Sequence, residues 1–248
     1  MTARAAPPRV LVLRAEPEAA RTAARLVALG FDPVVAPLTR IVATGEPPPE
    51  GGFDALLVTS ARAAPFLAAL PDEMRALPVF TVGAASAQAM TEAGFPDARS
   101  ADGDALALSG LVRESLPAGA RLLHVAGEDR KDEPGASLAA AGLRVVPWCA
   151  YRAQARPLEA RVRDALAQDT LQGALHYSRR SVALALEAAR TGGVEGEFLR
   201  LLHAAISEDA ADPLRRAGAG RVLVAQEPRE TALLSTFADA ASVAFGAR

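Results

Sequence analysis

Three stretches in the first half of this chain recur in similar form in the second half, and this repetition limits the folds that the chain can adopt. Each block of the first half reappears in the second half in the same order: Arg9–Val35 with Arg121–Pro147, Leu57–Ala63 with Leu175–Ser181, and Thr81–Phe95 with Ala205–Ala219. The spacing between matched residues grows slowly along the chain, as a tandem duplication with small insertions predicts. A repeat of this length is too long for a solenoid, so each copy is expected to form a domain-sized α/β unit.

Short apolar runs alternate with amphipathic stretches in both copies. The runs predict strands near 9–14, 32–36, 54–59, 78–82 and 97–99, and again near 121–126, 143–148, 172–177, 203–206 and 221–224. Helices are predicted between them, over 16–29, 61–70, 84–93, 104–115, 132–141, 158–168, 179–191, 208–217 and 230–243. This alternation indicates βαβ units and a parallel sheet. A glycine follows four of these helices, where a left-handed C-terminal cap favours it: Gly30, Gly94, Gly142 and Gly218.

Composition excludes several kinds of site. The formal net charge is −2, which argues against nucleic-acid binding. Cys149 is the single cysteine, so a disulfide within the chain and a thiolate metal cluster are excluded. The histidines His124, His176 and His203 lack metal-ligand spacing and lie in apolar runs, which predicts core or rim positions. The single lysine, Lys131, lies among charged residues and is expected to be solvated. No metal is expected.

The termini and the hydropathy pattern predict a cytoplasmic protein. The first apolar run starts at Val10 and is already broken by Arg14, which does not fit a signal peptide. No stretch approaches the roughly 18 apolar residues of a membrane span. No apolar surface stripe is evident, so a monomer without membrane contact is expected.

Small or hydroxyl residues stand where predicted strands end and helices begin, notably at Ser60, Ser86, Ser178 and Ser207. These turns fall at the carboxyl ends of parallel strands, the usual ligand edge of an open α/β sheet. Helix N-termini there offer unpaired N–H groups and a positive dipole end to anions. The alternative is that the four serines are ordinary N-caps. None of the turns is a glycine-rich phosphate loop, so a dinucleotide site is poorly supported.

The order of motifs resembles the uroporphyrinogen-III synthase family from Arg9 to about Val224. The resemblance is carried by six stretches: "RVLVLRAEPEAARTAARLVALGFDPVVAPLTRI", "DALLVTSARAA", "PVFTVGAASAQAMTEAGF", "LLHVAGEDR", "WCAYRA" and "AAISEDAADPLRRAG". It implies two similar parallel-sheet, flavodoxin-like α/β domains joined by a two-stranded flexible linker. By this analogy 1–37 and 154–248 form one discontinuous domain, 40–151 form the inserted second domain, and the chain crosses near 38–39 and 152–153.

The resemblance also implies a reaction, that of a cyclising hydro-lyase of tetrapyrrole and heme biosynthesis. The enzyme would close hydroxymethylbilane, a linear tetrapyrrole octacarboxylate, into uroporphyrinogen III. Water would be lost and the terminal ring inverted through a spirocyclic intermediate. No cofactor is implied. The partners would be this small-molecule substrate and, through transient contact, the preceding enzyme of the pathway. Positioning and charge stabilisation can achieve such a closure without a strong nucleophile.

Carried onto this sequence, the family's motifs point to two candidate catalytic residues, Tyr151 and Ser86. Tyr151 could donate a proton to the departing hydroxyl, because a phenol is protonated at neutral pH. The alternative is a linker residue with its hydroxyl in water. The candidates for binding substrate carboxylates are Arg14, Ser60, Arg62, Gly83, Gly127, Tyr177, Ser178, Arg179 and Ser207. The arginines could instead be ordinary surface residues.

The second copy departs from the family at one turn. The family's glycine–x–threonine–threonine reads Ser207-Glu208-Asp209-Ala210 here, which places acidic residues where carboxylates would bind.

A different function class also fits the same helix starts, namely a clamp or sensor domain that binds a small anion without catalysis. An assay that separates product isomers I and III distinguishes the two.

Overall fold

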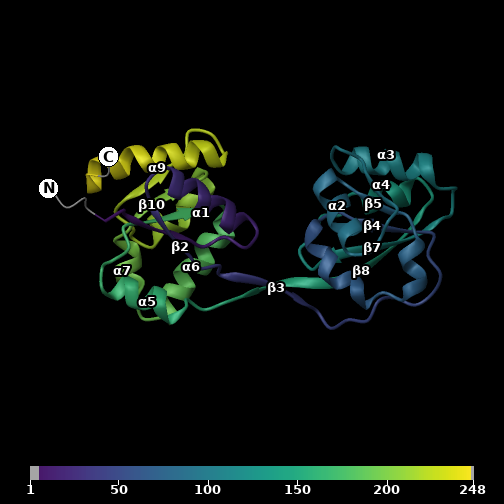
Figure 1. Ribbon diagram of the computed structural model, residues 1–248, viewed down its shortest axis with the longest axis horizontal. Coiled ribbons are helices and arrows are strands. Elements are labelled where there is room, and N and C mark those ends of the chain that lie inside the picture. The colour runs from purple at the N-terminus through teal and green to yellow at the C-terminus, as the bar shows by residue number, and fades with distance from the viewer. Residues whose placement is uncertain (1–5, 247–248) are drawn as a thin grey trace. The chain divides into compact units, whose positions relative to one another are not determined.

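The structure is a computed structural model that describes residues 6–246. It divides into two compact units. Unit 1 is formed by Met1–Arg40 with Ala155–Arg248, and unit 2 by Ile41–Gln154. Each unit contains its own sheet and its own helices, and the chain passes from one unit to the other twice (Figure 1).

Unit 1 is built around five parallel strands in the order β11-β10-β9-β1-β2. In chain order its elements are β1 (Arg9–Val12), α1 (Glu18–Ala28), β2 (Asp32–Val35), α5 (Ala160–Ala167), β9 (Gly173–His176), α6 (Arg179–Thr191), α7 (Glu195–Leu199), β10 (Leu202–Ala205), α8 (Glu208–Arg216), β11 (Val222–Val224) and α9 (Glu230–Phe245). The N-terminal β1 lies at the inside of this sheet, between β2 and β9.

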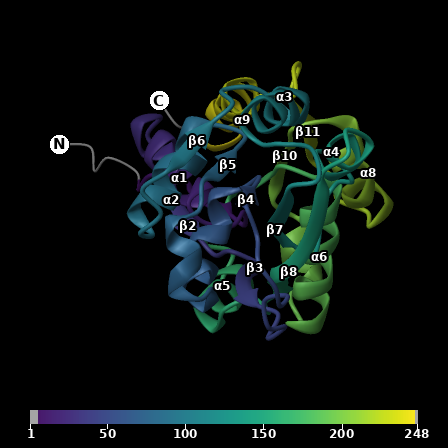
Figure 2. The ribbon, with the colours of Figure 1, turned by 90° about the vertical axis from the view of Figure 1, so that its right-hand side faces the viewer.

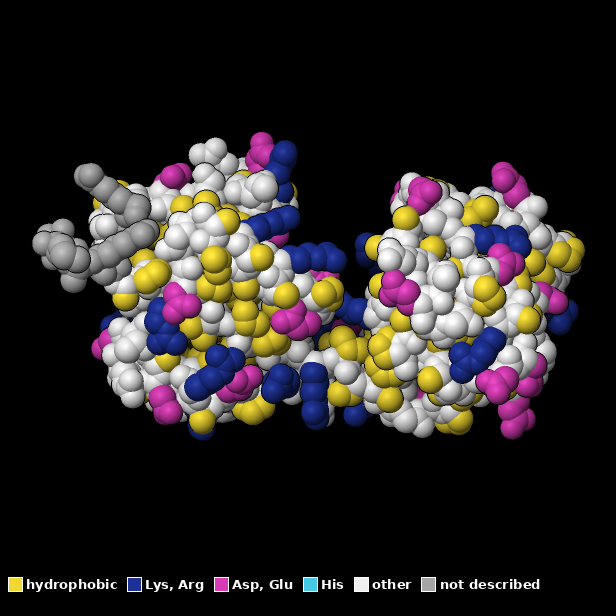
Figure 3. Space-filling model, viewed as in Figure 1, with side chains coloured by type: hydrophobic (Ala, Val, Ile, Leu, Met, Phe, Trp, Pro, Cys, Tyr) yellow, Lys and Arg dark blue, Asp and Glu magenta, His cyan; other side chains and the backbone are white. Residues whose placement is uncertain are grey.

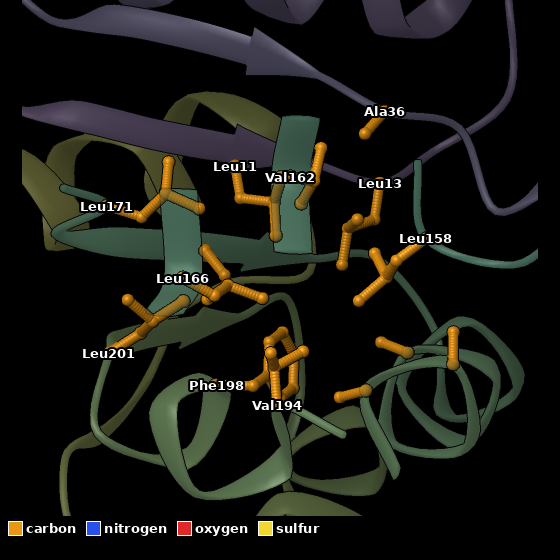
Figure 4. Packing of buried hydrophobic residues seen from close by; sticks show 14 of the residues in the cluster. Leu11, Leu13, Ala36, Leu158, Val162, Leu166, Leu171, Val194, Phe198 and Leu201 are labelled. Carbon is orange, nitrogen blue, oxygen red and sulfur yellow. The ribbon is translucent and has the colours of Figure 1, made fainter. Parts of the chain in front are cut away.

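Helices cover both faces of the unit 1 sheet, so its inner strands β9 and β10 are buried along their whole length. Successive side chains of a strand point to opposite faces. Leu11 and Leu13 therefore pack with Val162 of α5 and Phe198 of α7 on one face, as Figure 4 shows. Residues of β1 that point the other way, such as Val12, pack in a separate cluster with α1 and α9.

Unit 2 holds a six-stranded sheet in the order β3-β8-β7-β4-β5-β6. Its elements are β3 (Thr39–Ala43), β4 (Ala55–Val58), the 3₁₀ helices η1 (Ala61–Ala69) and η2 (Asp72–Ala76), β5 (Val79–Thr81), α2 (Ala84–Glu92), β6 (Ala98–Ser100), α3 (Ala105–Ser115), β7 (Arg121–Gly127), α4 (Gly135–Ala140) and β8 (Arg144–Ala155). The five strands from β8 to β6 pair in parallel. One face packs on η1, η2 and α2, and the other on α3 and α4.

The two sheets confirm the duplicated, parallel-sheet α/β fold class. Without β3, the order β8-β7-β4-β5-β6 of unit 2 corresponds to β2-β1-β9-β10-β11 of unit 1. The repeated sequence blocks fall on corresponding strands, so β7 and β8 repeat β1 and β2, β4 repeats β9, and β5 repeats β10. The glycines after four helices also adopt the expected positive φ, at 85° for Gly30, 84° for Gly142, 93° for Gly94 and 92° for Gly218.

Several elements differ from the sequence-based expectation. The strand β3 and the short helices η2 and α7 were not predicted. Ala61–Ala69 is a 3₁₀ helix with Pro65 inside it, where an α-helix was expected, because proline removes an N–H donor and crowds the preceding turn. β8 runs on to Ala155, well beyond the predicted end near 148, and it has β3 as its second neighbour.

Two histidines form a buried pair in unit 1. His203 and His176 are 0% and 1% exposed. His203 Nε2 lies 3.0 Å from the Phe198 carbonyl oxygen, which can only accept, so this nitrogen donates. His203 Nδ1 then accepts from His176 Nε2 at 3.0 Å. Burial lowers the pKa of His203 to about 4 and that of His176 well below its usual value. Both rings are therefore neutral near pH 7.

Acid should weaken unit 1 because of this pair. Below pH 6.5 the unfolded chain binds protons at both histidines and the folded chain does not, so the free energy of unfolding falls as the pH drops toward 4. The slope should reach about 1.4 kcal/mol per pH unit for each histidine. Urea unfolding at pH 7, 6 and 5 measures this slope, and the H176L/H203L variant should have a shallower one. Equal slopes in the variant and the wild type would contradict the assignment.

Candidate active site

A pocket of about 350 Å³ lies in unit 2, where several parallel strands end at one edge of the sheet. Thr59 and Ser60 follow β4, Val82 follows β5, and Gly127 and Tyr151 belong to the paired strands β7 and β8. Figure 2 shows β7 and β8 side by side. Parallel pairing brings the carboxyl ends of these strands to the same edge, so residues that are far apart in sequence line one pocket.

Tyr151 lines this pocket with its ring held in the core. The residue is 8% exposed, and its ring stacks on Phe66 of η1 with centroids 5.2 Å apart. Gly127 is its register partner on β7, at an irregularity of the strand pairing. A Cβ atom at Gly127 would lie 2.7 Å from Tyr151 Cε2, so only glycine leaves room for the ring. The Tyr151 ring is therefore part of the hydrophobic core of unit 2.

The hydroxyl of Tyr151 is placed beside a serine and an arginine. Burial raises the pKa of Tyr151, while a hydrogen bond with Ser60 and the positive charge of Arg62 act in the opposite direction. Ser60 is the N-cap of η1 and its Oγ accepts from the Arg62 amide at 3.3 Å. The net effect keeps the Tyr151 phenol protonated at neutral pH, as a proton donor requires.

Charged side chains of both signs surround the pocket. The lining includes four basic residues, Arg62, Arg130, Lys131 and Arg152, and three acidic residues, Glu128, Asp129 and Glu133. Most of them belong to the loop between β7 and α4, which sequence reasoning did not place at the site. Lys131 is exposed, as expected. On the face of the molecule in Figure 3, basic and acidic side chains are likewise interspersed over each unit.

His124 of β7 also lines the pocket and is 4% exposed. Its Nε2 atom is buried and has no hydrogen-bond partner among residues 6–246. Burial, and then the charge of Arg130, lowers the pKa of His124 to about 4. The ring is therefore neutral near pH 7. His176 and His203 are core residues and His124 is a rim residue, so the expectation for all three histidines is confirmed.

The other predicted residues of unit 2, Gly83 and Ser86, do not belong to the lining of this pocket. Gly83 is the N-cap residue of α2, and Ser86 lies in the first turn of that helix. Ser86 is therefore not an N-cap, and that part of the alternative is wrong. Ser60, Ser178 and Ser207 do cap their helices, each with its side-chain oxygen accepting from a backbone amide of the first turn.

The remaining predicted residues gather at the corresponding edge of unit 1. Arg14 follows β1, Tyr177 to Arg179 follow β9, and Ser207 follows β10. The Arg14 guanidinium carbon lies 3.9 Å from the centroid of the Tyr177 ring. The Tyr177 hydroxyl donates to Glu230 at 2.8 Å. Burial, opposed by a hydrogen bond with Thr22 and reinforced by Glu230, raises the pKa of Tyr177 to about 12.

Acidic side chains already occupy part of the unit 1 edge. Arg179 makes ion pairs with Asp209 at 3.0 Å and with Asp212 at 2.9 Å. Glu208 pairs with Arg215. Ala210, which stands where the family has threonine, is 0% exposed and packs among alanines. The acidic turn thus neutralises an arginine that was expected to bind substrate.

Replacing Gly127 with alanine tests the packing of Tyr151. The added methyl group meets the Tyr151 ring, so the free energy of unfolding should fall by about 1–3 kcal/mol. The matched control is Gly110→Ala in α3, where an added Cβ meets no atom within 4 Å. That variant should be more stable by about 0.5–1 kcal/mol. Urea unfolding of both variants measures these changes. A free energy of unfolding for G127A equal to that of the wild type would mean that the Tyr151 ring is loosely packed.

No helix within residues 6–246 is long and apolar enough to cross a bilayer. The same part of the chain contains no group of three or more histidine, cysteine, aspartate or glutamate residues suited to a metal ion.

Comparison with known proteins links this chain to one family. The family model described as uroporphyrinogen-III synthase HemD matches residues 20–235. No curated protein matches significantly. Among solved structures, uroporphyrinogen-III synthetase from Helicobacter pylori is 14% identical with a TM-score of 0.56, covering 97% of this chain and 100% of the other. This likeness supports the fold.

Two structures of uroporphyrinogen III synthase from Thermus thermophilus are also similar. A mutant is 22% identical with a TM-score of 0.48, covering 95% of this chain and 99% of the other. The wild type is 23% identical with a TM-score of 0.45, covering 96% and 99%. The family model alone spans well over half of the sequence, and on that ground the chain belongs to the uroporphyrinogen-III synthase family.

Proposed function

We propose that this protein closes hydroxymethylbilane to uroporphyrinogen III, acting as a cyclising lyase of tetrapyrrole biosynthesis. The family match over residues 20–235 supports the reaction. The main observation that supports a site for this reaction is the position of Tyr151. Its ring is buried, and its hydroxyl lies at a pocket beside Ser60 and Arg62. The pocket offers one protonated phenol and several cations, which suits a polyanionic substrate that must lose water.

The chemistry asks little of any single side chain. The carbon–oxygen bond of the hydroxymethyl group breaks, and the oxygen leaves as water once it has taken a proton. The electron-rich pyrroles stabilise the cation that remains. Attack through the substituted carbon of the terminal ring then gives the spirocyclic intermediate, and rearrangement with loss of a proton from carbon gives the inverted ring. The protein holds the folded conformer for which this attack is the shortest path.

In this scheme Tyr151 donates the proton to the leaving hydroxyl. Arg62 and the charged loop between β7 and α4 bind carboxylate arms of the substrate, with arginine and lysine as charge-assisted donors. In unit 2 the helix start at Gly83 adds backbone N–H groups with a positive dipole end, and in unit 1 the helix starts at Ser178 and Ser207 offer donors of the same kind. Because these donors are distributed, carboxylate binding needs no basic protein.

A product-isomer assay tests the proposed function. Hydroxymethylbilane is generated fresh, incubated with the wild-type protein, and the products are separated into isomers I and III. The wild type should give mainly isomer III. A product ratio equal to that of the protein-free reaction would overturn the proposal and would favour a binding protein without catalysis.

Tyr151→Phe should slow the reaction without changing its product. The variant keeps the ring stacked on Phe66 and removes only the hydroxyl. A general acid contributes typically 10²–10⁴-fold, and this leaving group departs easily, so we expect a loss of about ten- to a hundredfold in kcat. Isomer III should remain the main product, because the pocket as a whole selects the conformer.

The isomer ratio is the internal control for this variant. Full activity in a folded Y151F protein would show that the hydroxyl does not donate the proton. Predominance of isomer I would show that the hydroxyl steers ring inversion, contrary to the division of roles proposed above. The melting temperature of the Y151F variant, compared with that of the wild type, tests whether the ring still packs in the core.

A further inference from the structure

Glu230 lies at the centre of a polar cluster in unit 1. It is the first residue of α9, and its side chain is 18% exposed. The carboxylate accepts from the Tyr177 hydroxyl at 2.8 Å and from Arg14 Nη1 at 3.2 Å. It also accepts from the hydroxyl of Thr22 and from Arg25, both on α1. One carboxylate thus joins α9, α1 and the segments after β1 and β9.

The cluster retains a positive charge after these contacts are made. The ion pairs of Arg14 and Arg25 within residues 6–246 both go to Glu230. Two guanidinium groups therefore share one carboxylate. Although burial raises the pKa of Glu230, hydrogen bonds from Thr22 and Tyr177 and the two arginines hold it below its usual value. The carboxylate is ionised at neutral pH, and the excess of one positive charge suits one further anion.

Arg14 is fixed on two sides and open on a third. Its guanidinium lies over the Tyr177 ring at 3.9 Å, and this stacking sets the plane of the group. Nη1 makes the hydrogen bonds to Glu230 at 3.2 Å and to Thr22 Oγ1 at 3.3 Å. Nε and Nη2 have no hydrogen-bond partner among residues 6–246, and the side chain is 24% exposed. These two donors form the edge that binds a carboxylate with two parallel hydrogen bonds.

We infer that Glu230 is a positioning residue, which holds Arg14 against Tyr177 so that the Nε and Nη2 edge of Arg14 binds one carboxylate arm of the substrate. This inference rests on the proposed function, since it takes the tetrapyrrole as the source of the carboxylate. Glu230 does not touch the substrate itself. Its effect reaches the substrate through Arg14, and this is what separates it from a residue that only supports the fold.

A double-mutant cycle on Glu230 and Arg14 tests the inference. Glu230→Ala releases Arg14, so KM for hydroxymethylbilane should rise about tenfold, the loss of one charge-assisted hydrogen bond, while kcat stays nearly constant. Arg14→Met should raise KM to a similar extent. The double variant should be no worse than Arg14→Met alone, because Glu230 then has nothing left to position.

Two further variants guard against a loss of fold. Glu230→Gln keeps the shape and the acceptor for Tyr177 but loses the charge that holds Arg14, so its KM should lie between those of the wild type and E230A. Glu187→Ala removes an exposed glutamate that pairs with Arg190 in α6 of the same unit, and it should change neither KM nor kcat. All measurements are made well below the melting temperature of each variant.

A structural readout completes the test. The Arg14 Nε–H signal in an NMR spectrum, identified by its absence in R14M, should be sharp in the wild type and broadened in E230A. Additive effects of E230A and R14M on KM, or an Arg14 signal unchanged in E230A, would overturn the inference. A wild-type protein that forms no excess of isomer III would instead refute the proposed function. The NMR comparison of the wild type with E230A would still test whether Glu230 positions Arg14.

Discussion

Parallel pairing of short, apolar strands is the constraint on which both candidate edges depend. In unit 2 the register of β7 with β8 puts Gly127 opposite Tyr151. The parallel register of β4 with β7 brings Ser60, which follows β4, to the same edge of the sheet. In unit 1 the pairing of β1 with β9 brings Arg14 beside Tyr177 in the same way. Each sheet is covered by helices on both faces, and the polar residues of both candidate edges lie at the strand ends, where water and ligands have access.

The duplicated units have different chemistry at their corresponding edges. The unit 2 pocket has more basic than acidic side chains and contains a buried phenol. At the unit 1 edge, Arg179 is neutralised by Asp209 and Asp212, and the second tyrosine donates to Glu230. Tyr177 therefore cannot play the part that Tyr151 plays, because its hydroxyl group already donates a hydrogen bond to the Glu230 carboxylate and burial raises its pKa to about 12. The duplication preserved the fold and left each edge free to specialise.

Most of the fold could be predicted from the sequence because the repeat and the alternation of apolar runs are local signals. The 3₁₀ form of η1 and the strand β3 were missed, since they depend on Pro65 and on the neighbour β8 respectively. Tyr151 could be named from its motif, but its burial against Phe66 required the folded register. Glu230 gave no signal, because its partners Arg14 and Thr22 lie more than two hundred positions away. The basic residues of the loop near Arg130 could not be assigned to the pocket, because in the sequence they form an ordinary run of charged residues typical of a solvated loop.

The chain order of unit 1 has a consequence for synthesis on the ribosome. β1 lies inside its sheet, yet its neighbour β9 is translated only after the whole of unit 2. A nascent chain that ends at residue 154 contains every residue of unit 2 but only β1 and β2 of the unit 1 sheet. The apolar face of β1 that packs with α5 and α7 has no cover during that interval. Domains fold as units during translation, so the inserted unit can fold first and the unit that begins the chain folds last.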